Sequence, residues 1–167
     1  RAEAGGVACY SSKNLTDWKF EGKVLPTVDD DPTSDLHPSQ VIERPKVIYN
    51  EKTGKFVMWA HVESADYSKA CAGVAVSDSP VGPFIYQGSF RPNNAMSRDQ
   101  TVFVDDDSTP WMSWGNGTCF LVKLKPNMTE LDGNIEILKM PKFVEGPWIH
   151  KRENLYYLTY ASMGKGR

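Results

Sequence analysis

The amino-acid sequence predicts an all-β protein, and three observations support this prediction. Runs rich in Val, Ile, Tyr, Phe, Trp and Thr recur along the chain, separated by clusters of Gly, Pro, Asp, Asn and Ser. No long apolar pattern appears at helical spacing. Two groups of these runs also return at intervals along the chain. The 167 residues are 40% hydrophobic and 24% charged, which is typical of a globular domain with a real core.

Each expected strand is bounded by turn residues. The segments 50–54, 105–109 and 152–154 are hairpin loops between neighbouring strands. In chain order, the expected strands are 6–11, 18–24, 46–49, 56–61, 72–77, 84–89, 101–104, 111–114, 119–123, 135–138, 148–151 and 155–161.

Internal repeats indicate how the strands are grouped. The run 6–9, followed by a polar loop and the run 18–22, returns as 73–76 and 84–88. A second, hairpin-like unit begins near Arg44, near Arg98 and at Glu145. A period of roughly 45 to 55 residues built of four short strands is typical of a β-propeller blade.

We therefore expect one partial β-propeller domain over residues 1–167. Its parts are a blade remnant at 6–25, full blades at 44–90 and 98–138, and a half-blade at 145–162. Two full blades and two half-blades are too few to close an ordinary propeller. The chain is expected to be a piece of a larger ring, unless its half-blades pair with each other or with another copy.

Charge and hydropathy argue against two classes of partner. The 19 Lys and Arg residues balance 21 Asp and Glu residues, for a net charge of −2 without a basic cluster, so no nucleic-acid partner is expected. No apolar stretch approaches the roughly 20 residues that a membrane span needs, so no membrane partner is expected. The N-terminal Arg-Ala-Glu does not resemble a signal peptide, so any targeting segment is expected to be absent already.

Cysteines and sequons bear on the compartment. The three cysteines are too widely spaced for metal binding and are expected to be buried thiols, or one disulfide and a free thiol. They are Cys9, Cys71 and Cys119. Three glycosylation sequons, each in a polar stretch, predict an extracellular glycoprotein. Their acceptors are Asn14, Asn116 and Asn127.

Acidic residues stand where three blades begin, at Glu43, Asp99 and Glu145. The innermost strand of a blade lines the channel, so residues just before it lie at the channel mouth. Glycosidases need two carboxyl groups, one protonated and one ionised, and a third can raise the pKa of the acid. Three acids at equivalent blade positions fit this chemistry. The alternative is that they satisfy exposed backbone N–H groups where strands begin.

Further side chains have a functional and a structural interpretation. His61 lies at the end of a strand next to the channel, where it contacts substrate or makes a structural hydrogen bond. Aromatic rings either stack on sugars or pack between blades. The tryptophans concerned are Trp59, Trp111, Trp114 and Trp148. The acidic runs 29–31 and 105–107 lack the spacing of a calcium loop and are interpreted as turns, so no metal ligands are predicted.

Two motifs carry a resemblance to a known family. Residues 97–107 read Ser-Arg-Asp-Gln-Thr-Val-Phe-Val-Asp-Asp-Asp, and residues 145–152 read Glu-Gly-Pro-Trp-Ile-His-Lys-Arg, followed by Tyr-Tyr-Leu at 156–158. They resemble glycoside hydrolase family 43, which implies a five-bladed propeller and an inverting glycosidase of plant-type polysaccharides. Residues 6–84 are similar to exo-β-1,3-galactanases, and residues 111–160 to xylosidases and arabinofuranosidases. The implied substrate is β-1,3-galactan or an arabinoxylan side chain.

The resemblance also implies roles for single residues. Glu145 corresponds to the general acid, and Asp99 to the acidic residue that raises the pKa of that acid and orients it. Glu43, in Glu-Arg-Pro-Lys, matches a substrate-contacting acid of the galactanase-like branch. Substrate-binding roles beside these are assigned to His61, Arg98 and Trp148.

The general base of the family has no counterpart in the residues. The general base would precede Arg1 in most members and follow Arg167 in the galactanase-like branch. Some members hold Ca²⁺ in the channel, and no other cofactor is expected. An alternative function is therefore a catalytically incomplete propeller that binds carbohydrate or serves in assembly outside the cell. Its open half-blades would be completed by remaining blades of the same protein or by other copies.

Overall fold

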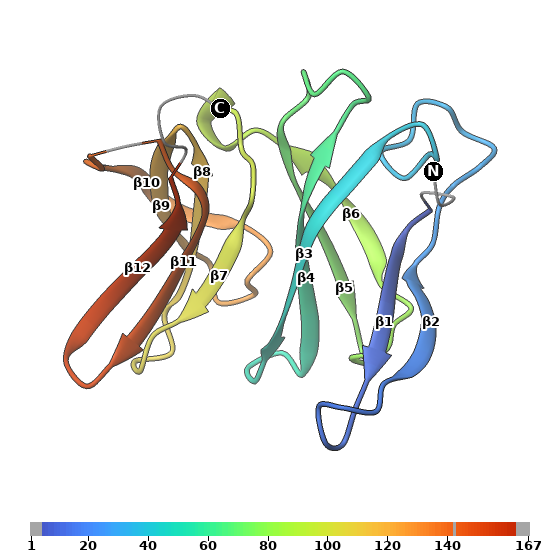
Figure 1. Ribbon diagram of the computed structural model, residues 1–167, viewed down its shortest axis with the longest axis horizontal. Helices are drawn as coiled ribbons and strands as arrows, with labels where there is room; N and C mark the ends of the chain where they lie inside the picture. The colour runs from blue at the N-terminus through green and yellow to red at the C-terminus, as the bar shows by residue number, and fades with distance from the viewer. Residues whose placement is uncertain (1–4, 142, 163–167) are drawn as a thin grey trace.

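The structure is a computed structural model that describes residues 5–141 and 143–162 (Figure 1). These residues form β-strands and one 3₁₀ turn, which confirms the all-β prediction. The elements are β1 (Val7–Ser11), β2 (Lys19–Leu25), β3 (Val41–Asn50), β4 (Lys55–Glu63), β5 (Cys71–Ser77), β6 (Ile85–Phe90), η1 (Pro92–Asn94), β7 (Thr101–Val104), β8 (Pro110–Asn116), β9 (Thr118–Leu124), β10 (Leu131–Leu138), β11 (Glu145–Arg152) and β12 (Leu155–Ala161).

The strands are grouped as antiparallel sheets in chain order. Within the described ranges, β3–β6 and β7–β10 each form a four-stranded sheet, and β1–β2 and β11–β12 each form a two-stranded sheet. Figure 1 shows β11–β12 in red against β7–β10, and β1–β2 in blue beside β3–β6. This arrangement is that of two propeller blades flanked by two half-blades.

The first strands of the blades converge on a common channel. Strand β7 contacts both β3 and β11. A cavity of about 280 Å³ lies between the three strands, and its lining includes Arg44, Asp99, Gln100 and Trp148. The residues at one end of these strands therefore come together although they lie far apart in the sequence.

Three strands begin three or more residues earlier than the sequence predicts. Strand β3 begins at Val41 instead of 46, β10 at Leu131 instead of 135, and β11 at Glu145 instead of 148. In β3 and β11 a proline interrupts the apolar pattern, but a bulge at Pro45 and at Pro147 lets the pairing resume beyond it. Consequently Glu43 and Glu145 lie within strands and do not precede them.

Apolar side chains between neighbouring sheets form the core. The main cluster joins β3–β6 to β7–β10 and contains Trp59 and Trp114, both with 0% exposure. The Trp59 indole donates a hydrogen bond to the Met128 carbonyl oxygen of the next blade at 2.9 Å. The packing interpretation is thus confirmed for these two tryptophans. The cysteines are all free thiols, with Cys71 and Cys119 buried and Cys9 half-buried, so the disulfide alternative was wrong.

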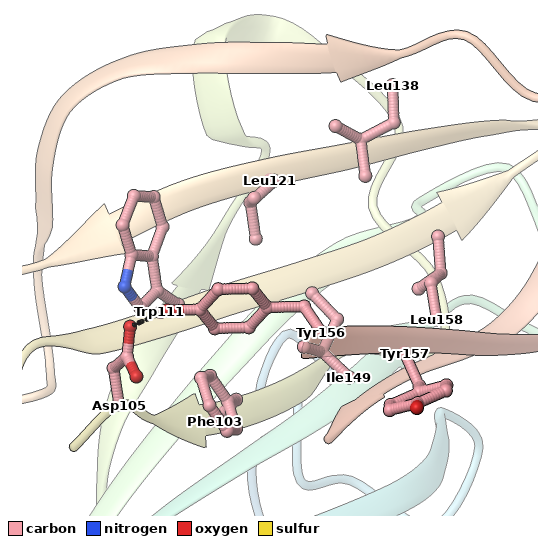
Figure 2. Close-up of a pocket in the computed structure, with 9 residues that line it drawn as sticks. All are labelled: Phe103, Asp105, Trp111, Leu121, Leu138, Ile149, Tyr156, Tyr157 and Leu158. Atoms are coloured by element: carbon pink, nitrogen blue, oxygen red, sulfur yellow. Dashed lines mark hydrogen bonds between the residues drawn. The ribbon is translucent and has the colours of Figure 1, made fainter. Parts of the chain in front are cut away.

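A polar link holds β11–β12 against β7–β10. The Asp105 carboxylate accepts hydrogen bonds from Lys151 Nζ at 2.7 Å and from the Tyr156 hydroxyl at 2.5 Å. Beside it lies an apolar cavity of about 410 Å³ between the two sheets, and its lining includes Trp111, Tyr156 and Leu158 (Figure 2). The hydrogen bonds from Lys151 and Tyr156 lower the pKa of Asp105 to about 2.

We expect Asp105→Asn to destabilise the protein in a pH-dependent way. Because the pKa of Asp105 is lower in the folded chain, its contribution to stability is fully present above about pH 4 and is lost as pH falls towards 2. Denaturant midpoints measured at pH 7 and at steps from pH 4 to 2 should therefore differ from wild type most at pH 7. The exposed Asp132→Asn serves as control, and an equal deficit at every pH would contradict the prediction.

No helix formed by the described residues has the length and apolar character needed to cross a membrane.

Candidate active site

The three channel-lining strands share one backbone irregularity. In β3, Arg44 and Pro45 lie opposite a single residue of β4, the one between His61 and Trp59. In β11, Gly146 and Pro147 likewise lie opposite a single residue of β12. The segment before β7 is similar, since the Gly115 amide donates to the Arg98 carbonyl oxygen at 3.2 Å. Such bulges redirect the side chains next to them and are frequent beside active sites.

The first residue of each bulge has a left-handed conformation. The φ angles are 53° at Arg44, 55° at Asp99 and 57° at Gly146. A left-handed residue other than glycine costs roughly 1–2 kcal/mol, so two of the three bulges carry strain at the channel. By this alignment Asp99 corresponds to Arg44 and Gly146, and Arg98 to Glu43 and Glu145. The expectation of three acids at equivalent positions was therefore wrong by one residue for Asp99.

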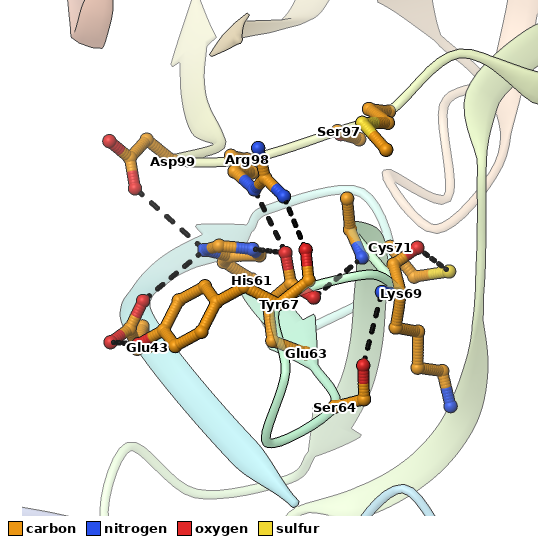
Figure 3. Close-up of polar contacts among 12 residues, drawn as sticks. Glu43, His61, Glu63, Ser64, Tyr67, Lys69, Cys71, Ser97, Arg98 and Asp99 are labelled. Carbon is orange, nitrogen blue, oxygen red and sulfur yellow. Dashed lines mark hydrogen bonds and ion pairs between the residues drawn. The ribbon is translucent and has the colours of Figure 1, made fainter.

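Glu43, His61 and Asp99 come together at the channel end (Figure 3). His61 is 2% exposed, and its Nδ1 lies 3.5 Å from Glu43 Oε2 and 3.9 Å from Asp99 Oδ1. The Tyr67 hydroxyl donates to Glu43 Oε1 at 2.6 Å, and this hydrogen bond raises the pKa of Tyr67. Nδ1 of His61 is buried without a hydrogen-bond partner among the described residues. Two carboxylates thus lie within 4 Å of one ring nitrogen.

Asp99 is held from the opposite side by an arginine. Arg44 Nε lies 3.3 Å from Asp99 Oδ1, and the Asp99 side chain is 8% exposed. An ionised carboxylate with little exposure needs such a partner because burial removes its water shell. The pair fixes Asp99 at the wall while part of the arginine stays in solvent.

Below His61 lies a carboxylate with no exposure, Glu63. It accepts hydrogen bonds from Arg98 Nε at 2.8 Å, from the Ala70 amide at 2.8 Å and from His61 Nε2 at 3.1 Å. Burial acts to raise the pKa of Glu63, but the hydrogen bonds from Ala70, Arg98 and His61 outweigh burial and hold the pKa below its usual value. Arg98 also donates to the Tyr67 carbonyl oxygen at 2.7 Å.

Close backbone contacts place Glu145 at the same end. The preceding Val144 pairs with Gly117 through two backbone hydrogen bonds of 3.1 and 3.3 Å. A Cβ at Gly115 would lie 2.8 Å from the Val144 carbonyl oxygen, so only glycine allows this approach. A methyl group at Gly146 would lie 3.8 Å from Asp99 Oδ2. The residue after Glu145 is therefore a direct neighbour of Asp99.

Trp148 faces the channel cavity and is 55% exposed. Its ring stacks on His150 at 4.8 Å between centroids, and His150 stacks on Tyr157 at 5.3 Å. One face of the Trp148 indole is therefore covered by His150. The other side of the indole remains accessible at the channel.

The structure adds three residues that the sequence analysis did not assign to the site. These are Arg44, Glu63 and Tyr67. Glu63 ends an apolar strand, and His61 lies two residues before it on the same face. This charged residue with a histidine two positions away was the one signal that the sequence offered. The position of Tyr67 depends on the loop between β4 and β5, where its φ is 58°. A tyrosine gives no sequence signal for such a left-handed conformation.

The described residues supply no evident cation site in the channel. Its wall carries Arg44 and Lys46 beside the single carboxylate of Asp99. Among the residues that the structure describes, no group of three or more His, Cys, Asp or Glu side chains is arranged to hold a metal ion.

Two of the sequon acceptors lie in turns away from the site. Asn14 is exposed in the turn between β1 and β2, and Asn127 is half-buried in the turn between β9 and β10. The side chain of Asn116 lies outside the described part of the chain.

Comparisons with family models and with solved structures point to the same family. A family model described as glycosyl hydrolases family 43 matches residues 1–167. An exo-β-1,3-galactanase of Phanerochaete chrysosporium, solved with β-1,3-galactotriose, is 32% identical with a TM-score of 0.87 over 96% of this chain and 38% of its own. An α-L-arabinofuranosidase of Clostridium thermocellum is 27% identical with a TM-score of 0.74 over 96% and 54% of the two chains.

A curated relative points the same way. The arabinoxylan arabinofuranohydrolase of Bacillus subtilis is 31% identical over 114 residues, which is 53% of this chain and 22% of the relative. The chain thus spans about a fifth of that relative and 38% of the galactanase.

Proposed function

The chain belongs to glycosyl hydrolase family 43, and from this premise we propose that the protein hydrolyses β-1,3-linked galactan. The observation that carries the proposal is the channel end, where the carboxylates of Glu43 and Asp99 lie on either side of Nδ1 of His61, at 3.5 and 3.9 Å. The higher structural similarity to the galactanase than to the arabinofuranosidase favours galactan over arabinoxylan side chains.

The proposed reaction inverts the configuration at the anomeric carbon. Glu145 donates its proton to the glycosidic oxygen of the leaving group, and Asp99 orients Glu145. The bond between that oxygen and the anomeric carbon breaks while a water molecule attacks from the opposite face. The base that takes the proton of this water lies about 6.5–9.5 Å from the acid in inverting enzymes. We assign it to a part of the protein outside residues 1–167, in remaining blades or another copy.

The sugar is held by the other residues at the channel end. Glu43 accepts hydrogen bonds from sugar hydroxyls through Oε2, since Oε1 is held by Tyr67 and the nearest ring nitrogen to Oε2, Nδ1 of His61, is 3.5 Å away. His61 and Arg98 support this side of the sugar, and the accessible side of Trp148 contacts its C–H face.

We also propose that the protein is extracellular and carries a glycan at Asn14. This side chain is exposed in a turn, as an acceptor must be. The Asn127 turn is less suited to glycosylation, because the carbonyl oxygen of the next residue, Met128, is hydrogen-bonded to Trp59 of the neighbouring blade. Peptide mapping of the protein secreted from a eukaryotic host, before and after enzymatic deglycosylation, tests this order. An unmodified Asn14 would contradict it.

Sugar release from β-1,3-galactan, compared with aryl arabinofuranosides and xylosides, tests the proposed activity. We expect galactose from the galactan and at most slow turnover of the other substrates. Release of arabinose alone would move the substrate to arabinoxylan. Binding of β-1,3-galactobiose without any release from the protein that carries this chain would support a carbohydrate-binding module instead.

A further inference from the structure

Glu63 is a buried ionised group that the proposed reaction does not use. It lies at the end of β4 with no exposure, and its two oxygens accept the three hydrogen bonds described above. Burying a carboxylate is costly unless it is fully paired, and removal of a partner leaves that cost uncompensated. A charge retained at this position therefore calls for a role in arranging its neighbours.

The first neighbour is His61. An ionised carboxylate is only a hydrogen-bond acceptor, so the 3.1 Å contact with Glu63 Oε1 requires the hydrogen of the pair to be on Nε2 of His61. This contact fixes the plane of the ring. Nδ1 is then directed at Glu43 and Asp99, the two carboxylates of the proposed sugar site.

The second neighbour is the loop between β4 and β5. Glu63 Oε2 accepts from the Ala70 amide at the end of this loop, and Arg98, paired with Oε1, holds the Tyr67 carbonyl oxygen in its middle. Tyr67 in turn donates to Glu43. Both Tyr67 and Ala70 have left-handed φ angles, of 58° and 43°, which require such support.

We propose that Glu63 is a positioning residue, which holds the proton on Nε2 of His61 and keeps the Tyr67 loop in place, and which thereby sets Glu43 for the sugar. The inference rests on the proposed function. Glu63 touches neither the sugar nor the reacting atoms; it acts through His61, Arg98 and the loop (Figure 3).

The test is Glu63→Gln, which keeps the shape and removes the charge. In one orientation the amide NH₂ of the glutamine faces the Ala70 N–H, and in the other it faces Arg98 Nε and His61 Nε2. In both cases a donor meets a donor, and a hydrogen bond is lost. We expect kcat/KM on β-1,3-galactan to fall about 10- to 100-fold, mainly through KM, because the residues that bind the sugar lose their positions. We also expect the ¹⁵N signals of His61 to shift, because Nε2 loses its charged hydrogen-bond acceptor.

A matched control is Glu21→Gln, since Glu21 is another paired carboxylate, which accepts hydrogen bonds from Ser11 Oγ at 2.6 Å and from Lys19 Nζ at 2.8 Å on β1–β2, away from the Tyr67 loop. This variant should leave KM and the His61 signal unchanged. A shift of KM and of the His61 signal in Glu21→Gln as large as in Glu63→Gln would reduce Glu63 to a structural role.

The wild-type protein provides a second measurement that requires no variant to fold. Its His61 Nε2 must carry a proton at neutral pH, and an unprotonated Nε2 overturns the proposal. Unchanged KM in a folded Glu63→Gln variant overturns it as well. Absence of galactan hydrolysis by wild type would instead contradict the proposed function, while the His61 signals of wild type and variant would still report whether Glu63 holds the ring.

Discussion

Glu145→Gln is expected to reduce the hydrolysis of β-1,3-galactan by about 10² to 10⁴-fold. The amide has the shape of the carboxyl group but no proton to give to the leaving oxygen. The fold should persist because Glu145 is half-buried at the start of β11, and its strand is held through the Val144 pairing with Gly117. Initial rates of galactose release, with thermal unfolding of the same samples, measure both effects.

The leaving group provides a sharper control for Glu145. An aryl galactoside with a strongly acidic phenol needs little protonation, so its hydrolysis should fall much less in Glu145→Gln than that of galactan. Glu136→Gln, an exposed change on β10, should leave both substrates unaffected. Equal losses on galactan and on the activated aryl galactoside would remove Glu145 from the role of general acid.

Trp59→Ala is expected to lower the free energy of unfolding by about 4 kcal/mol. The side chain is fully buried in the cluster between β3–β6 and β7–β10, and its removal also leaves the Met128 carbonyl oxygen without its indole donor. Because domains are stable by only about 5–15 kcal/mol, the two sheets should then separate easily. Urea unfolding followed by tryptophan fluorescence and circular dichroism measures the change.

Trp18→Ala is the matched control, since Trp18 is 54% exposed directly before β2. Its cost should stay below about 1 kcal/mol. A similar loss from both variants would show that Trp59 does not join the two blades in the way its burial and its hydrogen bond indicate.

The agreement between sequence and structure is closest where the pattern is local. The limits of β7 and β12 were predicted without error, and β4, β5 and β9 within two residues at each end. Each of these strands alternates or concentrates apolar residues between clear turn residues, which is information carried by a few neighbouring positions. Strand β3 was predicted five residues too short at its start because Pro45 resembles a strand boundary.

The site was predictable in its acids but not in its supporting residues. Glu43, Asp99 and Glu145 stand out because acidic residues recur where blades begin. The contact between Arg98 and Glu63 joins residues 35 positions apart, and the hydrogen bond from Tyr67 to Glu43 spans 24 positions. Such partners have no spacing rule, since they depend on how two blades and a loop meet.

By itself the sequence determined the all-β class, the repeating blades and the acids at the channel. The reason is that strand alternation and the blade period depend only on the order of residues along the chain. The tertiary structure alone decided that Asp99 aligns with Arg44 and Gly146, and that Glu63 lies beneath His61. The physical reason is that a bulge shifts register by one residue, and only packing between blades determines where a shifted side chain meets its partners.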